Sequence, residues 1–186
     1  MSVKSTGSIR SITLREVLKR AKSAISRKIR YGLGYGGLNP DAPGPESAEG
    51  LCDCSGFVCW CLGFSRKVDD VKYVEFNGGW VNTDAMIQDG KYWGRLFTIL
   101  DEPKVGCLIV YGSGKGRRYG HVGIVVSVTK GKVEKVIHCS KENERRYGNA
   151  VWETDDAVWR GKKTYFLWYK GIVGHKGIVG QKGGVK

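Results

Sequence analysis

The stretch Asp53-Cys54-Ser55-Gly56-Phe57-Val58 lies between a Gly- and Pro-rich segment and a short apolar run that ends at Gly63. This pattern predicts a loop over residues 31–50 and a helix over about 55–62. A cysteine at a helix start sits at the positive end of the helix dipole, beside N–H groups without intrahelical partners. Both features lower the pKa of a thiol, and the same N–H groups can hold an oxyanion. Cys54 is therefore the candidate nucleophile, with small Ser55 and Gly56 leaving room for a substrate, although buried helix cysteines are commonly only packing residues.

A thiol nucleophile needs a base, and the chain has three histidines, of which His175 falls in a Gly-rich terminal repeat. His121 opens one apolar strand pattern and His138 ends the next. A hairpin turn at 129–132 would bring the two to the same end of a sheet. One would then act as the general base beside Cys54 and the other would orient it. The alternative is two unrelated polar residues at strand ends.

The two halves of the chain have different periodicities. Thr13 and Glu16 form a capping box before apolar residues at helical spacing, which predicts a helix over about 14–30, and Thr83 is a candidate cap for a short helix through Gln88. The second half alternates between apolar runs and turn residues, which predicts strands. The chain is therefore expected to be α+β, with helices packed on one face of an antiparallel sheet. The expected strands are 107–111, 121–128, 133–138 and 164–169.

The net charge of +13 is concentrated at the two ends. Residues 1–31 carry +8 and residues 160–186 carry +7, which leaves −2 for the middle of the chain. Attraction to a polyanion such as a wall polymer, nucleic acid or anionic lipid is one interpretation, and a solvated helix face with a basic tail is the other. Neither a membrane-spanning run nor a secretory signal peptide is expected from the sequence.

The six cysteines do not have the spacing of a metal site or a disulfide framework. Cys52, Cys54, Cys59 and Cys61 form two C-x-C pairs, without the C-x2-C spacing of zinc ligands and without a pair of histidines. We therefore expect no metal, no cofactor and buried cysteines that act as small hydrophobic residues.

Three motifs together resemble the NlpC-type papain-like cell-wall cysteine peptidases. They are Asp-Cys-Ser-Gly-Phe-Val at 53–58, Gly-His-Val-Gly-Ile at 120–124 and Val-Ile-His-Cys-Ser at 136–140. The segment Tyr31-Gly-Leu-Gly-Tyr-Gly-Gly and the strand after Pro103 also resemble the family, over about residues 14–170. Two positions depart from its pattern, because Cys107 stands where an aspartate is usual and Tyr35 where a tryptophan is common.

The resemblance implies a papain-like core and a Cys-His-His triad of Cys54, His121 and His138. It makes Tyr31, Tyr35, Asp53 and Ser55 the candidate substrate-binding residues, with Asp53 and Ser55 also supporting the local turn. The implied layout is an N-terminal arm at 1–13, a peptidase domain at 14–170 and a flexible basic tail at 171–186.

The activity that the resemblance implies is hydrolysis of amide bonds in peptidoglycan stem peptides, by an endopeptidase in preference to an amidase. The alternatives are an acyl transferase or deamidase toxin on the same core, and a non-catalytic protein that binds wall or nucleic acid. Peptidoglycan is the expected partner, with anionic wall polymers at the basic ends, an immunity protein in the case of a toxin, and nucleic acid disfavoured. The expected setting is synthesis in a cytoplasm and action on the wall after release, injection or as part of a phage particle.

Overall fold

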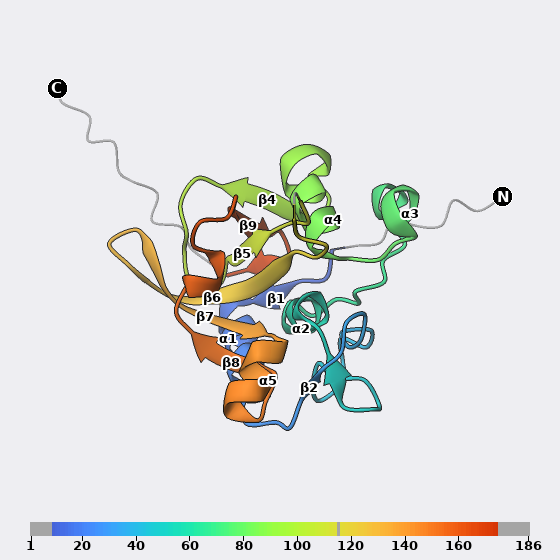
Figure 1. Cartoon of the computed structure of the whole chain (residues 1–186). Coiled ribbons are helices and arrows are strands. Elements are labelled where there is room, and N and C mark those ends of the chain that lie inside the picture. Colours follow the sequence, from blue (N-terminus) through green and yellow to red (C-terminus); the bar gives the residue numbers. More distant parts are fainter. Residues whose placement is uncertain (1–8, 115, 175–186) are drawn as a thin grey trace.

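The computed structural model of the chain describes residues 9–114 and 116–174 and has an α+β architecture (Figure 1). Its centre is a six-stranded antiparallel sheet with the strand order β4-β9-β5-β6-β7-β8. The predicted α+β class and antiparallel sheet are confirmed. The strands of this sheet are β4 (Phe97–Leu100), β5 (Leu108–Tyr111), β6 (His121–Thr129), β7 (Lys132–Cys139), β8 (Val151–Thr154) and β9 (Tyr165–Tyr169).

Helices and short turns surround the sheet. The sequence predicted α1 and α2 and the position of α4, but it did not predict α3, α5, β4 or β8. The helices are α1 (Leu14–Ile25), α2 (Cys54–Cys61), α3 (Val71–Asn77), α4 (Thr83–Gln88) and α5 (Lys141–Tyr147), with a π-helical turn at Asp89–Trp93 and a 3-10 turn at Ala157–Trp159.

The β6–β7 hairpin has the predicted connection. Thr129 pairs with Lys132, and the two residues between them have positive φ angles, 50° at Lys130 and 74° at Gly131. Two positive φ angles are the conformation that matches a two-residue turn to the twist of its strands. The hairpin extends past the other strands (Figure 1), and its pairing fixes which residues of β6 and β7 lie opposite one another.

Two short pairs of parallel strands lie outside the main sheet, one joining the two ends of the described chain and one flanking the Gly-rich loop. β1 (Ile12–Thr13) pairs with β10 (Ile172–Val173), and β2 (Arg30–Tyr31) pairs with β3 (Leu51–Cys52). Ile12 and Ile172 are both buried. These two apolar side chains therefore join the core from just outside the predicted boundaries at 13 and 170. Residues 1–8 and 175–186, which include most of the predicted arm and tail, lie outside the described residues.

Helix α1 starts where the sequence predicted and ends earlier. The Thr13 hydroxyl accepts the Glu16 amide at 3.2 Å, which confirms the cap. The helix stops at Ile25 instead of about residue 30, because Asn149 donates from its side-chain nitrogen to Ala24 O and Ile25 O and accepts from the Ile29 amide. A residue more than 120 positions away thus supplies the C-terminal cap, which no local pattern could indicate.

Helix α4 has a different cap from the one expected. The side chain of Asn82 accepts the Ala85 amide at 2.9 Å, so Asn82 and not Thr83 is the N-cap. Gly90 does not stop the chain from coiling, because the π-helical turn follows directly and ends at Gly94, which has a φ of 60°.

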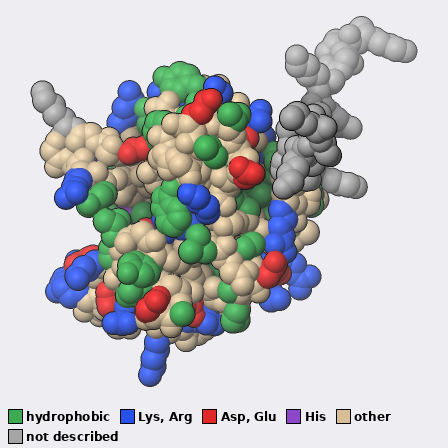
Figure 2. All heavy atoms as spheres, turned by 90° about the vertical axis from the view of Figure 1, so that its right-hand side faces the viewer, with side chains coloured by type: hydrophobic (Ala, Val, Ile, Leu, Met, Phe, Trp, Pro, Cys, Tyr) green, Lys and Arg blue, Asp and Glu red, His purple; other side chains and the backbone are tan. Residues whose placement is uncertain are grey.

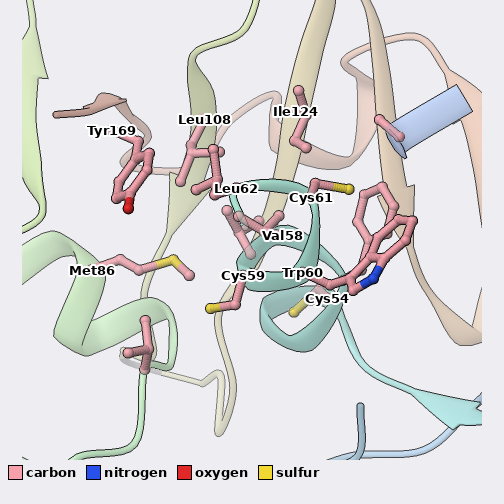
Figure 3. Packing of buried hydrophobic residues seen from close by; sticks show 14 of the residues in the cluster. Cys54, Val58, Cys59, Trp60, Cys61, Leu62, Met86, Leu108, Ile124 and Tyr169 are labelled. Carbon is pink, nitrogen blue, oxygen red and sulfur yellow. The ribbon is translucent and has the colours of Figure 1, made fainter. Parts of the chain in front are cut away.

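The main core lies between α2 and one face of the sheet. Figure 3 shows side chains of α2 lying among Met86 of α4 and Leu108 and Ile124 of the sheet, together with Tyr169. Every residue of α2 is buried, and all six cysteines of the chain are buried free thiols. The opposite face of the sheet carries a second cluster that includes Cys107, Val125 and Val136 and is covered by Trp159.

The surface mixes charges and apolar side chains. On the face shown in Figure 2, lysine and arginine side chains are spread around the molecule with acidic side chains among them. None of the helices in the described part of the chain has the length and apolar character needed to cross a membrane.

Candidate active site

Cys54 is the first residue of α2 and lies against the start of β6. Asp53 is the N-cap, with an extended backbone and a side chain that accepts the Gly56 amide at 2.8 Å. The backbone N–H groups of Val122 and Ser55 hydrogen-bond to the Cys54 sulfur. Because Val122 directly follows His121 in the chain, the start of the helix and the start of the strand meet at this thiol.

A buried ion pair holds the helix start in place. The Arg66 side chain is 1% exposed and forms an ion pair with Asp53 at 3.0 Å. It also donates to Ser55 Oγ at 2.8 Å and to Tyr35 O at 2.8 Å, and its guanidinium stacks over the Trp80 ring. A buried charge pair is stable only when its remaining hydrogen-bonding groups also have partners. These contacts give partners to most of the N–H groups of Arg66. Arg66 therefore fixes the turn that carries Cys54.

The small residues after Cys54 make room for the protein's own loop. A Cβ at Gly56 would lie 2.7 Å from Tyr35 O and 2.8 Å from Gly36 O. Ser55 is buried and bonded to Arg66 and Asp53. The expectation that Ser55 and Gly56 leave space for a substrate is therefore wrong, because the Gly-rich loop packs on the helix start and fills that space.

The two histidines meet as the hairpin register predicted. His121 Nε2 and His138 Nδ1 are 2.8 Å apart, with the rings nearly perpendicular. Gly123 lies two residues after His121 on the same face of β6, and a Cβ there would lie 3.0 Å from the His138 Cβ. Glycine at this position therefore leaves the space through which His138 reaches the His121 ring. Because Nε2 of His121 is bonded to His138, a further partner of this imidazole would have to use Nδ1.

Aromatic packing holds both imidazole rings. The Trp159 ring lies 5.2 Å from the His121 ring and 5.1 Å from the His138 ring, measured between centroids. The centroid of the Tyr111 ring lies 6.2 Å from that of the His121 ring. Both aromatic residues are at least nine-tenths buried, so the imidazoles are kept in a largely dry environment.

Burial sets the protonation of the nucleophile in the free protein. Cys54 is 7% exposed, and desolvation raises the pKa of its thiol to about 12, with a further rise from the Asp53 carboxylate. The N–H groups of Val122 and Ser55 and the charge of Arg66 lower this pKa by less. The expected lowering of the thiol pKa by the helix start is therefore wrong for the free protein, because the cost of burying a thiolate outweighs the helix dipole.

The same burial keeps the two histidines neutral. Desolvation lowers the pKa of His121 well below its ordinary value, and the neighbouring His138 and Lys162 lower it further. Desolvation also lowers the pKa of His138, to about 4. Near neutral pH the site therefore holds a thiol and two neutral imidazoles, in which each ring carries one proton.

The two candidate tyrosines differ in how they lie relative to the nucleophile. Burial raises the pKa of the Tyr31 phenol, with smaller contributions from Cys54 and Asp53, and Tyr31 pairs with Cys52 between β2 and β3. The Tyr35 side chain is 44% exposed, and its carbonyl accepts the Asp53 amide at 3.0 Å. Tyr31 thus lies on the strand paired with Cys52, two residues before the nucleophile, whereas Tyr35 contributes its backbone to the turn and its ring to the surface.

Sequence reasoning missed several residues that shape this site. Arg66 has no motif around it, and its pairing with Asp53 depends on the loop's path. Trp159 lies in a 3-10 turn and Thr154 at the end of an edge strand, neither of which was expected. Val151, Trp152 and Thr154 are residue types enriched in strands, and this was the available signal for β8.

Comparison with known proteins identifies the family. A model of the CHAP domain matches residues 46–143, which is more than half of the chain. The chain belongs to the CHAP domain family. CHAP domains are of the NlpC-like and papain-like peptidoglycan hydrolase type, so the predicted resemblance is confirmed at that level. The match to the CHAP domain includes Cys54, His121 and His138 and ends before β8.

Other comparisons give weaker likenesses. No curated protein matches the chain. The crystal structure of Ly7917 is similar over 86% of this chain with 16% identity and a TM-score of 0.43. Ly7917 with the hydrolyzing product of MDP is similar over 84% with 15% identity and a TM-score of 0.37. The chain spans 63% of the length of each of these two structures.

Proposed function

We propose that this CHAP domain protein hydrolyses an amide bond in the stem peptide of peptidoglycan, as an endopeptidase in preference to an amidase. Cys54 is the nucleophile, His121 the general base and later the acid, and His138 the residue that orients His121. The observation that carries the proposal is the 2.8 Å contact between the two histidines, beside a thiol held by the Val122 amide. The core is then papain-like, with the nucleophile helix packed on one face of the sheet.

The reaction starts from the neutral pair. As the Cys54 sulfur attacks the amide carbonyl, its proton passes to His121 Nδ1, so the thiolate forms only together with the new bond. The N–H group of Cys54 at the helix start is a donor for the oxyanion. His121 then gives its proton to the leaving amine, and the acyl group remains on sulfur.

Release of the acyl group reverses the roles. A water molecule loses a proton to His121 Nδ1 and attacks the thioester, and the protonated His121 returns that proton to the sulfur. His138 accepts from His121 Nε2–H throughout, which stabilises the cation formed on His121 in each step. The carboxylic acid product then leaves, and the thiol and neutral imidazole are restored.

The surroundings of the thiol support separate roles for the other candidates. Tyr31, on the strand paired with Cys52, is the candidate for lining the substrate site, and the exposed Tyr35 ring is a second candidate contact. Asp53 and Ser55 are buried and bonded to Arg66. Their contribution to substrate binding is to hold the turn and the Tyr35 loop.

Peptidoglycan digestion by single variants tests the proposal. The wild type should lower the turbidity of a peptidoglycan suspension, and Cys54→Ala and His121→Ala should each reduce the rate by at least about a hundredfold. Cys59→Ala is the matched control, because Cys59 is a buried cysteine of the same helix that packs in the core. Equal activity of the wild type and Cys54→Ala would contradict the mechanism. Mass spectrometry of the digested muropeptides then identifies the bond and separates endopeptidase from amidase.

A further inference from the structure

A chain of three hydrogen bonds runs from the start of β6 to the edge strand β8. The first joins His121 Nε2 and His138 Nδ1 at 2.8 Å. The second joins His138 Nε2 and Thr154 Oγ1 at 3.0 Å. In the third, the Thr154 hydroxyl donates to the carbonyl oxygen of Asp155 at 2.8 Å. The chain therefore ends on a backbone carbonyl, a group that can only accept.

The carbonyl of Asp155 therefore fixes which atom donates and which accepts in each of the three hydrogen bonds. A hydroxyl has one hydrogen, and Thr154 gives it to Asp155 O, so Thr154 Oγ1 must accept from His138 Nε2–H. A neutral imidazole also has one hydrogen, so His138 Nδ1 carries a lone pair. This nitrogen must accept from His121 Nε2–H, which leaves the lone pair of His121 on Nδ1.

The geometry around the rings supports a single arrangement. Trp159 packs against both imidazoles, and a Cβ at Gly123 would lie 3.0 Å from the His138 Cβ, so the two strands are in close contact here. Thr154 pairs with Val136, two residues before His138, so the hydroxyl and the ring lie on the same face of the sheet. Both histidines are buried, which favours the neutral rings that the argument needs.

We propose that Thr154 is a positioning residue of this site, whose hydroxyl sets the tautomers of both histidines so that His121 presents an unprotonated Nδ1 to Cys54. The inference rests on the proposed function for its consequence in catalysis. Thr154 lies beyond the residues that match the CHAP domain. The hydroxyl belongs to the edge strand β8, which pairs with β7.

Three variants separate a positioning role from a structural one. Thr154→Val keeps the shape and removes the hydroxyl, and Thr154→Ser keeps the hydroxyl. Thr98→Val is the matched control, because Thr98 is an exposed threonine on β4, the edge strand at the opposite side of the sheet. Without the hydroxyl, His138 can place its proton on Nδ1. That proton would point at His121 Nε2 and leave His121 protonated at Nδ1, the form that cannot act as a base.

Nitrogen-15 NMR of the imidazole rings reads the tautomers without any substrate. In the wild type, Thr154→Ser and Thr98→Val, both histidines should be protonated at Nε2, with signals assigned by His121→Gln and His138→Gln. In Thr154→Val this pattern should be lost. The rate of peptidoglycan hydrolysis should fall roughly 10- to 100-fold in Thr154→Val, part of what a general base contributes, with KM unchanged and with Thr154→Ser close to wild type.

Each result decides the proposal. A wild-type spectrum with His138 protonated at Nδ1 would overturn it, even if Thr154→Val failed to fold. Wild-type tautomers and rate in Thr154→Val would also overturn it, as would an equal loss of rate in Thr154→Ser. A wild type without hydrolase activity, combined with the predicted spectra, would refute the proposed function and leave the tautomer assignment supported.

Discussion

At the scale of single residues, the site depends on burial more than on charge. Cys54 sits at the start of a helix, yet the cost of burying its thiolate raises the thiol pKa to about 12. The sequence identified the position but not its burial, because the aromatic side chains around the site come from distant segments. Tyr111 and Trp159, which pack against His121, lie 57 and 105 positions from Cys54 in the chain.

The buried His138 makes stability depend on pH. Its pKa is about 4 in the folded protein against an ordinary 6.5, so between these values the unfolded chain binds a proton that the folded protein does not. The free energy of unfolding should therefore decrease as the pH falls from about 6.5 to 4, and the decrease due to this residue should stop below 4. Its size is on the order of 3 kcal/mol.

Urea unfolding at pH 7, 6, 5 and 4 measures this effect. His138→Asn should lose less stability than the wild type over the same range, while the contributions of carboxylates cancel in the comparison. The two proteins would show parallel pH dependence if His138 were not held neutral by burial.

At the scale of elements, the sequence predicted what depends on local patterns. The Thr13 cap, the start of α2 and the two-residue turn at 130–131 all follow from residues within a few positions of one another. The end of α1 depends on Asn149, and the position of the start of α2 depends on Arg66. Neither could be predicted from neighbouring residues. The edge strand β8 is four residues long, and its place beside β7 is what gives Thr154 its role.

The register of β6 on β7 makes Gly123 a sensitive position. In Gly123→Ala the new Cβ would lie 2.5 Å from Val136 Cγ1 and 3.0 Å from the His138 Cβ, so β7 or the His138 side chain must shift. We expect a loss of about 1 to 3 kcal/mol in the free energy of unfolding, as for other overpacked sites. The rate of hydrolysis should fall further than this loss of stability explains, because the His121–His138 bond is displaced.

Ser127→Ala on the same strand is the control, since Ser127 is at the far end of β6 and bonds to Glu134. Urea unfolding and the turbidity assay on both variants check the prediction. A Gly123→Ala protein with full activity would mean that the two histidines tolerate a displaced register.

At the scale of the whole molecule, the basic ends are closer to the fold than the sequence suggested. The pairing of β1 with β10 joins the two ends at Ile12 and Ile172, which keeps the chain entering α1 next to the chain leaving β9. A truncation that tests the charged C-terminus must therefore keep residues through Gly174. Removal of residues 171–186, the tail as the sequence defined it, would also remove a buried isoleucine from the core.

Charge on the segment 175–186 should contribute to binding of an anionic wall. This segment contains Lys176, Lys182 and Lys186 and no acidic residue. In a Cys54→Ala background, which leaves the wall undigested, a chain ending at Gly174 should bind wall material more weakly than the full chain. As salt rises, binding of the full chain should also decrease more steeply than binding of the chain ending at Gly174, because salt screens exposed charges.

Pelleting with purified wall at increasing salt measures both effects, and a full-length chain with these three lysines changed to glutamine separates charge from length. Binding that does not respond to salt, or a glutamine variant that binds like the wild type, would show that the tail's charge is not what attracts the wall. Tight binding to nucleic acid without any wall binding would instead favour a non-catalytic role for the basic ends. Under the proposed function, screening of the tail should lower hydrolysis only at limiting wall concentration, because charge that gathers substrate raises the encounter rate and leaves the chemistry at Cys54 unchanged.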